Sequence, residues 1–145
     1  MRFLIDTNIL VRLKDLASEH HKLCYDKVVA LRTQNTPLYI CAQVLIEYWS
    51  VSTCSIEHNG LGQTTEQNFQ DCQDFLRMFM LLMEPADIVD RWFGLVRQYD
   101  VKGRQVYDAR LVALAMSYNI KYILTINTAD YIRYTEVTAV HPSTI

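Results

Sequence analysis

Short apolar runs alternate along the chain with longer segments in which apolar residues recur at helical spacing. Four runs have the length and the aliphatic content of buried strands: residues 2–5, 38–42, 122–126 and 136–140. Each is apolar along most of its length instead of alternating with polar residues. Such strands are covered on both faces, which is typical of parallel sheets.

The segments between these runs predict helices. One starts at Ile9, with Thr7 or Asn8 as its N-cap, and Pro85 and Asp108 each open a later one. The remaining helical spacing covers residues 19–32, 43–54, 66–99 (two or three helices) and 108–118. Strands separated by helices indicate an α/β fold with a mostly parallel sheet covered on both faces. Residues 55–65 form the one sustained loop, and we find no internal repeat.

Length and composition narrow the class of protein. A chain of 145 residues, half of them apolar and 21% charged, fits a single domain spanning residues 1–145. No apolar run is long enough for a signal peptide or a bilayer span, so we expect a cytoplasmic protein with no membrane segment. The four cysteines form no CxxC pair, and free thiols in a reducing compartment are expected.

The net charge of −2 provides no basic field for holding a nucleic acid. This weighs against a passive binder, which must neutralise phosphates with its own Lys and Arg side chains. It weighs less against a nuclease, because metal ions can contact the scissile phosphate. Four basic residues near the acidic motifs are either phosphate contacts or ordinary surface charge: Arg12, Lys14, Arg104 and Arg110.

Four acidic residues are candidates for a site. Open parallel sheets bind ligands beyond the carboxyl ends of their strands, and Asp6 directly follows the first strand. Glu47 lies in a strongly apolar helix, where an unpaired carboxylate would cost several kcal/mol. Each has a structural alternative: a strand terminus or helix cap for Asp6, a buried pair for Glu47, and a helix cap for Asp108 and for Asp130.

Carboxylates that converge at one sheet edge repel one another and raise each other's pKa. Hard divalent cations relieve that repulsion, and Mg²⁺ and Mn²⁺ prefer carboxylate ligands. No Cys/His cluster suggests zinc. A metal held in this way can polarise a phosphoryl oxygen and lower the pKa of water, as hydrolysis of a phosphodiester requires.

Four segments, in order and with the approximate spacing of a known family, resemble the motifs of PIN domains. They are residues 5–10 (IDTNIL), 44–49 (VLIEYW), 106–113 (VYDARLVA) and 123–131 (ILTINTADY). An isolated Asp-Thr-Asn would be weak evidence, whereas four motifs in order are strong. The resemblance covers essentially the whole chain.

The resemblance implies a three-layer α/β/α sandwich and Mg²⁺- or Mn²⁺-dependent cleavage of RNA. Many members are the toxin of a toxin–antitoxin pair, form homodimers and are silenced by an antitoxin segment that enters the acidic groove. Carried over by position, Asp6, Glu47 and Asp108 are the catalytic metal-site residues. The site-organising residues would be Thr7, Asn8, Thr125 and Asn127.

Two positions depart from the family pattern. Asn127 stands where members often carry Asp, and Tyr107 stands where close relatives often have His. An amide can ligate or position water but adds no negative charge, so Asp130 is a candidate fourth catalytic acid.

Three functions are weighed. The first is a metal-dependent endoribonuclease. Because Asn127 removes a charge, the alternative is a non-catalytic RNA-binding or scaffolding module on the same fold. A phosphotransfer receiver or aspartyl phosphatase needs acids that Asp6-Thr7-Asn8 does not supply.

Overall fold

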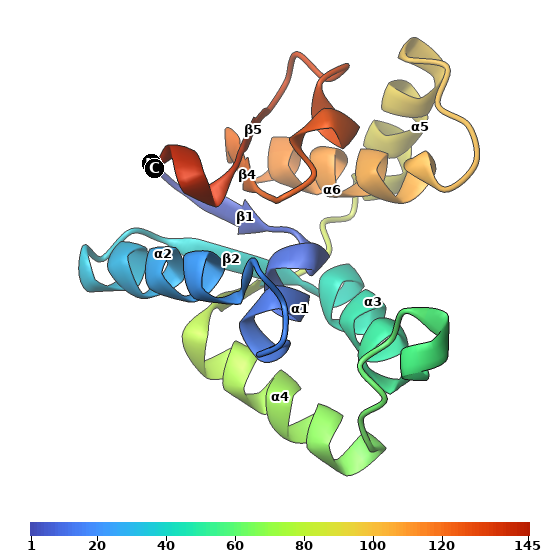
Figure 1. Cartoon of the computed structure of the whole chain (residues 1–145). Helices are drawn as coiled ribbons and strands as arrows, with labels where there is room; N and C mark the ends of the chain where they lie inside the picture. The colour runs from blue at the N-terminus through green and yellow to red at the C-terminus, as the bar shows by residue number, and fades with distance from the viewer.

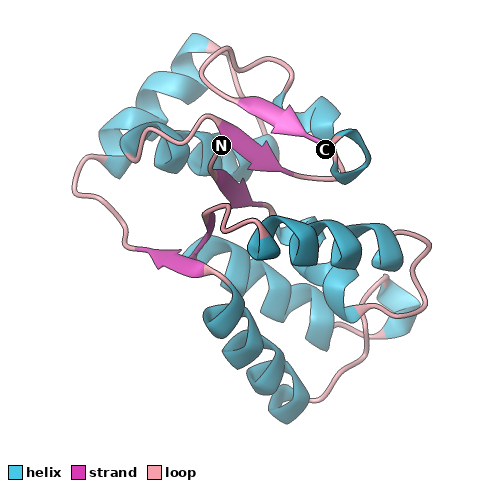
Figure 2. Ribbon diagram, turned by 90° about the vertical axis from the view of Figure 1, so that its left-hand side faces the viewer, coloured by secondary structure: helices cyan, strands magenta, loops and turns pink.

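A computed structural model describes residues 1–145 and contains one parallel sheet of five strands (Figures 1 and 2). The strands are β1 Phe3–Ile5, β2 Leu38–Cys41, β3 Met80–Leu82, β4 Tyr122–Leu124 and β5 Thr138–Val140. Their order across the sheet is β3-β2-β1-β4-β5, so the first strand lies in the middle. The expected parallel α/β architecture is confirmed, and the sheet is parallel throughout.

Six α-helices and three short 3-10 turns connect the strands. The helices are α1 Thr7–Lys14, α2 His21–Thr33, α3 Ala42–Thr53, α4 Thr65–Met78, α5 Ile88–Gln98 and α6 Gln105–Ser117. The turns are η1 Ile56–His58, η2 Thr128–Tyr131 and η3 Pro142–Thr144. Helix α1 contacts α2 and α3, α3 contacts α4, and α5 packs on α6. The strands separate the α1–α4 group from the α5–α6 pair (Figure 1).

The central strands carry the core. Every residue of β1 is buried, and its register aligns Ile5 with Leu124 at the end of β4. The ends of β1 and β4 therefore lie next to each other, although they are far apart in the sequence. All four cysteines are free, as expected. None of the helices combines the length and the apolar character needed to cross a membrane.

One strand was not predicted. β3 lies in the apolar run 78–83, which the helical spacing assigned to the region 66–99. It follows α4 after a single residue, and Met80 and Leu81 are about half exposed because β3 is an edge strand. β3 has no buried residue and directly continues the apolar spacing of α4, so no separate buried run marks it in the sequence.

Three helix starts also differ from the prediction. Asp6, not Thr7 or Asn8, is the N-cap of α1. Helix α5 begins at Ile88, three residues after Pro85, so Pro85 lies in the preceding turn. Helix α6 begins at Gln105, which moves Asp108 from the cap into the first turn.

Candidate functional site

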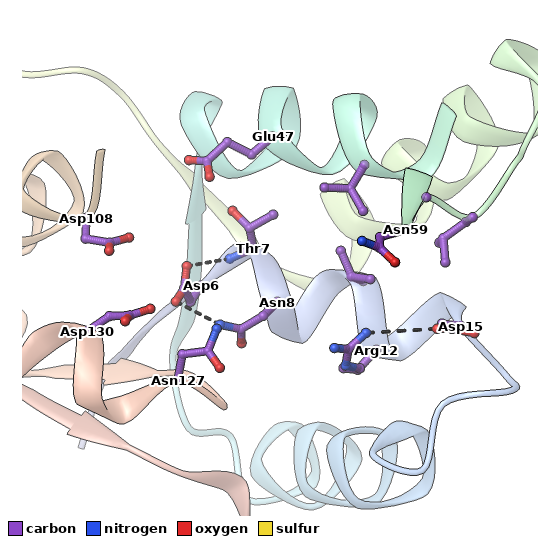
Figure 3. A pocket seen from close by; sticks show the side chains of 14 residues that line it. Asp6, Thr7, Asn8, Arg12, Asp15, Glu47, Asn59, Asp108, Asn127 and Asp130 are labelled. Carbon is purple, nitrogen blue, oxygen red and sulfur yellow. Dashed lines mark hydrogen bonds and ion pairs between the residues drawn. The ribbon is translucent and has the colours of Figure 1, made fainter. Parts of the chain in front are cut away.

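A pocket of about 600 Å³ opens at the carboxyl ends of β1 and β4. Its lining comes from α1, α3, α6, η2 and the loop after η1: Asp6, Thr7, Asn8, Val11, Arg12, Asp15, Glu47, Val51, Asn59, Gly60, Leu61, Asp108, Asn127 and Asp130. The four predicted acids therefore line one pocket, together with Thr7, Asn8 and Asn127 (Figure 3). Thr125 lies just beneath, fully buried.

Asp6 is the most firmly held of the four acids. Its Oδ1 accepts a hydrogen bond from the backbone N–H of Thr7 at 2.8 Å. Its Oδ2 accepts from Thr125 Oγ1 at 2.8 Å and from Asn8 Nδ2 at 3.1 Å. Burial raises the pKa of Asp6, while the bonds from Thr125 and Thr7 oppose that rise. Asp6 is thus both the cap of α1 and a member of the acidic group.

The polar residues around Asp6 tie the ends of β1 and β4 together. Asn8 Nδ2 also donates to Thr125 Oγ1 at 2.9 Å, and Asn8 Oδ1 accepts from the Ile126 N–H at 3.0 Å. Thr125 Oγ1 in addition accepts from the Asn127 N–H at 3.1 Å. The two strand ends are therefore fixed by side chains as well as by the sheet, and Asp6 has one orientation.

Glu47 projects from α3 toward Asp6 (Figure 3). It accepts a hydrogen bond from Gln43 Nε2 at 2.7 Å. Although the helix sequence is apolar nearly all round, Glu47 itself is only half-buried, so its carboxylate does not lie in a closed core. Burial is the main cause that raises the pKa of Glu47, and the Asp6 carboxylate adds to it. The buried Thr7 hydroxyl lies beside Glu47 and acts in the opposite direction, lowering the pKa of the Glu47 carboxyl.

Asp108 has no cationic partner. Burial raises its pKa to about 7, with further contributions from the carboxylates of Asp6, Asp130 and Glu47. Helix α6 begins at Gln105, and Arg104 is at its N-cap position. The Asp108 carboxylate therefore does not cap the helix and can face the pocket.

Asp130 lies on η2 and faces the pocket from its exposed rim. The residue at the N-cap position of η2 is Asn127, so the capping alternative for Asp130 is wrong. Asn127 is exposed and lines the pocket beside it. Both candidates for completing the acidic group are thus at the same rim.

The donor set suits a hard divalent cation. Its members are carboxylates that repel one another, and no lysine or histidine lies among them. No group of three or more His, Cys, Asp or Glu side chains is already drawn together tightly enough for a metal site. An ion would therefore have to draw the acidic side chains closer, at the gain of relieving their repulsion.

The four basic residues noted in the sequence have different environments. Arg12 is the only basic side chain in the pocket lining, at the end away from Asp108, where it faces Asp15 at 3.9 Å (Figure 3). Lys14 instead pairs with Asp74 at 2.8 Å. Arg110 pairs with Glu84 and donates to Gln43. Arg104 is exposed at the N-cap position of α6. Of the four suggested phosphate contacts, only Arg12 therefore lines this pocket.

Sequence reasoning missed two kinds of site residue. Gln43 was not singled out, although it lies one helical turn before Glu47, where residues four apart meet on one face. The segment Asn59–Leu61, within the predicted loop of residues 55–65, lines the far end of the pocket. Tyr131, buried beside Asp6 and Asp108, followed Asp130 in the last motif without being noticed.

Comparisons with known proteins agree with this architecture. A VapBC2 structure from Rickettsia felis, bound to a DNA fragment from its promoter, is similar with a TM-score of 0.75 and 19% identity, covering 97% of this chain and 98% of that one. VapBC-1 from nontypeable Haemophilus influenzae gives 0.71 and 18%, covering 99% of each chain. Mycobacterium tuberculosis VapC20, described as a Sarcin-Ricin loop cleaving toxin, gives 0.65 and 17%, covering 94% and 98%.

At these identities the structural likeness establishes the fold alone. A search of curated proteins found no significant match. The sequence itself matches the PIN domain family over residues 3–135, a range that contains all four motifs and every pocket-lining residue. The chain therefore belongs to the PIN domain family.

Proposed function

We propose that this protein is a cytoplasmic, metal-dependent endoribonuclease, the toxin of a toxin–antitoxin pair. The observation that carries the proposal is the convergence of four carboxylates, from four separate segments of the chain, on one pocket that contains no lysine or histidine. Such a group is costly for folding, since burial and mutual repulsion raise the pKa of three of its members. A bound divalent cation would offset the repulsion between the carboxylates and could contact a phosphodiester substrate.

In this proposal Asp6, Glu47 and Asp108 hold Mg²⁺ or Mn²⁺, and Asp130 is the fourth acid at the rim. When bound there, such an ion would polarise a phosphoryl oxygen and would lower the pKa of a water molecule that it binds. The chain's own contribution is orientation: Thr125 and Asn8 fix the Asp6 carboxylate through their hydrogen bonds. Thr7 stands beside Glu47, and Asn127 presents an amide at the rim.

RNA is the substrate that several features favour. VapC20, a structural relative, is described as cleaving the Sarcin-Ricin loop, which is RNA. In the pocket, five acidic side chains face a single basic one, Arg12, so a polyanion needs a cation at the acidic end. Arg12 can then contact a second phosphate of the same strand. The DNA in the VapBC2 structure is a promoter fragment and does not suggest a DNA substrate for this pocket.

The same comparisons support the proposal that this chain has partner proteins. The relatives include toxin–antitoxin complexes, among them one from Klebsiella pneumoniae. We propose that an antitoxin segment enters the acidic groove and that the chain forms a homodimer. Exposed apolar side chains on α3 and α5, such as Ile46, Trp49 and Phe93, are available for such contacts. Light scattering should give a dimer mass, and co-expression with a small neighbouring gene product should yield a complex without ribonuclease activity.

The decisive experiment compares purified wild type with Asp6→Asn on a panel of fluorescent RNA oligonucleotides and the matching DNA oligonucleotides. Each reaction is run in Mg²⁺, in Mn²⁺ and in EDTA. The expected result is RNA cleavage by the wild type with either ion, and none with EDTA or with Asp6→Asn. A matched control is Asp90→Asn, the same chemical change at an exposed acid of α5 away from the pocket, which should cleave like the wild type.

The controls separate the possible failures. Equal cleavage by wild type and Asp6→Asn would identify a contaminating ribonuclease. Cleavage of DNA alone would overturn the substrate class but not the metal-dependent chemistry. Retained RNA binding without cleavage by the wild type would favour the scaffolding alternative.

A further inference from the structure

Gln43 is a buried amide in the first turn of α3, only 8% exposed, and its side chain makes three hydrogen bonds to groups on α3 and α6. Its Nε2 donates to Glu47 Oε1 at 2.7 Å and to the backbone oxygen of Tyr107 at 2.9 Å. Its Oε1 accepts from Arg110 Nη1 at 2.8 Å. One side chain therefore connects α3, which carries Glu47, with α6, which carries Asp108.

These three partners fix the orientation of the amide. An arginine can only donate, so the oxygen of Gln43 has to face Arg110. The Glu47 carboxylate and the Tyr107 carbonyl can only accept, so the NH₂ group has to face them. A reversed amide would oppose donor to donor once and acceptor to acceptor twice. Arg110 is itself held by Glu84, in the connection between β3 and α5.

We propose that Gln43 is a positioning residue for the acidic site, and that Arg110 locks its amide so that the NH₂ group holds the Glu47 carboxylate ready for a divalent cation. This inference rests on the proposed metal-dependent function. The amide N–H holds one oxygen of the Glu47 carboxylate and so fixes the orientation in which the carboxylate can bind an ion. Arg110 acts through Gln43 and touches neither substrate nor ion.

The competing explanation is a purely structural tie between α3 and α6. The chain contains a comparison for it at an exposed glutamine, Gln67. Gln67 on α4 donates through Nε2 to Asp71 Oδ1 at 3.1 Å, also four residues along one helix, and neither residue lines the pocket. Removing either amide deletes one glutamine-to-carboxylate hydrogen bond, but only the first is at the acidic site.

The test measures binding of Mn²⁺ alone to the full chain by calorimetry, so no RNA or activity is involved. Gln43→Met keeps the length of the side chain and removes its hydrogen bonds. We expect Mn²⁺ affinity to fall about 10-fold or more, the lower end of the effect of losing a residue that orients a metal ligand. Gln67→Met should bind Mn²⁺ like the wild type. Arg110→Met should weaken binding, and Arg110→Lys, which retains a donor for Gln43, should restore most of it.

Circular dichroism identifies any variant that fails to fold, and the Arg110→Met and Arg110→Lys pair tests the proposal even if Gln43→Met does fail. If the wild type binds Mn²⁺ and Gln43→Met, or both Arg110 variants, bind it with the same affinity, the positioning role is overturned and the proposed function is not. Equal weakening by Gln67→Met would overturn it too, since the effect would then be one of general stability. Failure of the wild type to bind Mn²⁺ would overturn the proposed function and this inference together.

Discussion

Two carboxylates, the buried Asp71 and the half-buried Asp108, have opposite surroundings. Asp71, on α4 and 3% exposed, accepts hydrogen bonds from the Tyr48 hydroxyl at 2.6 Å and from Gln67 at 3.1 Å. The Lys14 ammonium lies 3.8 Å from it. Asp108 has three carboxylates around it and no cation, and its pKa is raised to about 7.

This difference separates a structural acid from a candidate functional one. A buried charge that is bonded on every side ties elements together, here α1, α3 and α4. A buried charge surrounded by others of the same sign destabilises the fold, unless something absent from the chain itself compensates it. Perturbed carboxylates in a pocket are typical of functional sites for this reason.

The largest expected difference between the two acids is in the rate of RNA cleavage after substitution. Asp108→Asn should lower the rate of RNA cleavage on the order of 100- to 1,000-fold, because losing one ligand of a catalytic ion forfeits several kcal/mol of transition-state stabilisation. Asp71→Asn should keep most of the activity, measured as initial rates well below the melting temperature of each variant. Similar losses in both variants would remove the functional distinction between the two acids.

Metal binding gives the next effect. Mn²⁺ at 100 times its dissociation constant should stabilise the folded chain by about 2.7 kcal/mol, since the ion binds only the folded site. The melting temperature should then rise by roughly 5–10 °C for a chain of this size. Asp108→Asn should reduce this increment, and Asp71→Asn should retain it, even though its melting temperature without metal is lower. The measurement is differential scanning fluorimetry in Mn²⁺ and in EDTA, and an increment that Asp71→Asn abolishes instead would place the ion elsewhere.

The pH dependence of stability tests the raised pKa of Asp108. The pKa of Asp108 is about 7 in the folded chain against an ordinary value of 3.8, so between these pH values the folded state binds more protons than the unfolded state. The free energy of unfolding therefore falls as pH rises from about 4 to 7. Asp108→Asn removes that loss.

In EDTA at pH 8, Asp108→Asn should be more stable than the wild type by on the order of 1 kcal/mol, a value reduced for solvent screening because this side chain is partly exposed. The gain should vanish at pH 4, where the wild-type carboxyl is protonated. Asp71→Asn should be less stable than the wild type by about 2 kcal/mol at pH 8, because it loses charge-assisted hydrogen bonds. Urea unfolding at the two pH values measures both. A destabilised Asp108→Asn at pH 8 would mean that Asp108 is compensated like Asp71.

The architecture was predictable where a strand lies within a distinct apolar run of the sequence. β1, β2, β4 and β5 are apolar runs next to clear helical spacing, and the central ones fill the core. The sequence does not predict β3, because its apolar residues continue those of α4 after a single residue. Apolar periodicity indicates burial, and β3 contains no buried residue that would mark it as a separate element.

The acids of the site were also predictable: Asp6 and Asp130 come after strands, Glu47 interrupts an apolar helix, and Asp108 opens a predicted helix. The four motifs in order join them into one site. Their partners were harder to find, because they depend on contacts between distant segments. Arg110 was interpreted as a phosphate contact or surface charge, yet its guanidinium is oriented by Gln43 and Glu84. The role of Asp108 depended on where α6 begins, and a three-residue difference in that boundary decides whether the carboxylate caps the helix.

The smallest expected effect concerns Asn127, where PIN domains often carry an acid. Asn127→Asp adds a negative charge at the exposed rim beside Asp130, so water screens most of the repulsion. Stability in EDTA should fall by less than about 1 kcal/mol, while Mn²⁺ should bind a few-fold more tightly because a further carboxylate faces it. The matched control is Asn59→Asp, also exposed and pocket-lining but at the end beside Arg12, where the charge should leave Mn²⁺ affinity unchanged. Calorimetric titration of the two variants with Mn²⁺ distinguishes two explanations. Equally tighter binding in both would mean that the whole groove attracts the ion through its general negative field. Tighter binding in Asn127→Asp alone would mean that the ion is bound at the acidic end, where Asp6 and Asp108 repel each other and where Asp71, with its own partners, takes no part.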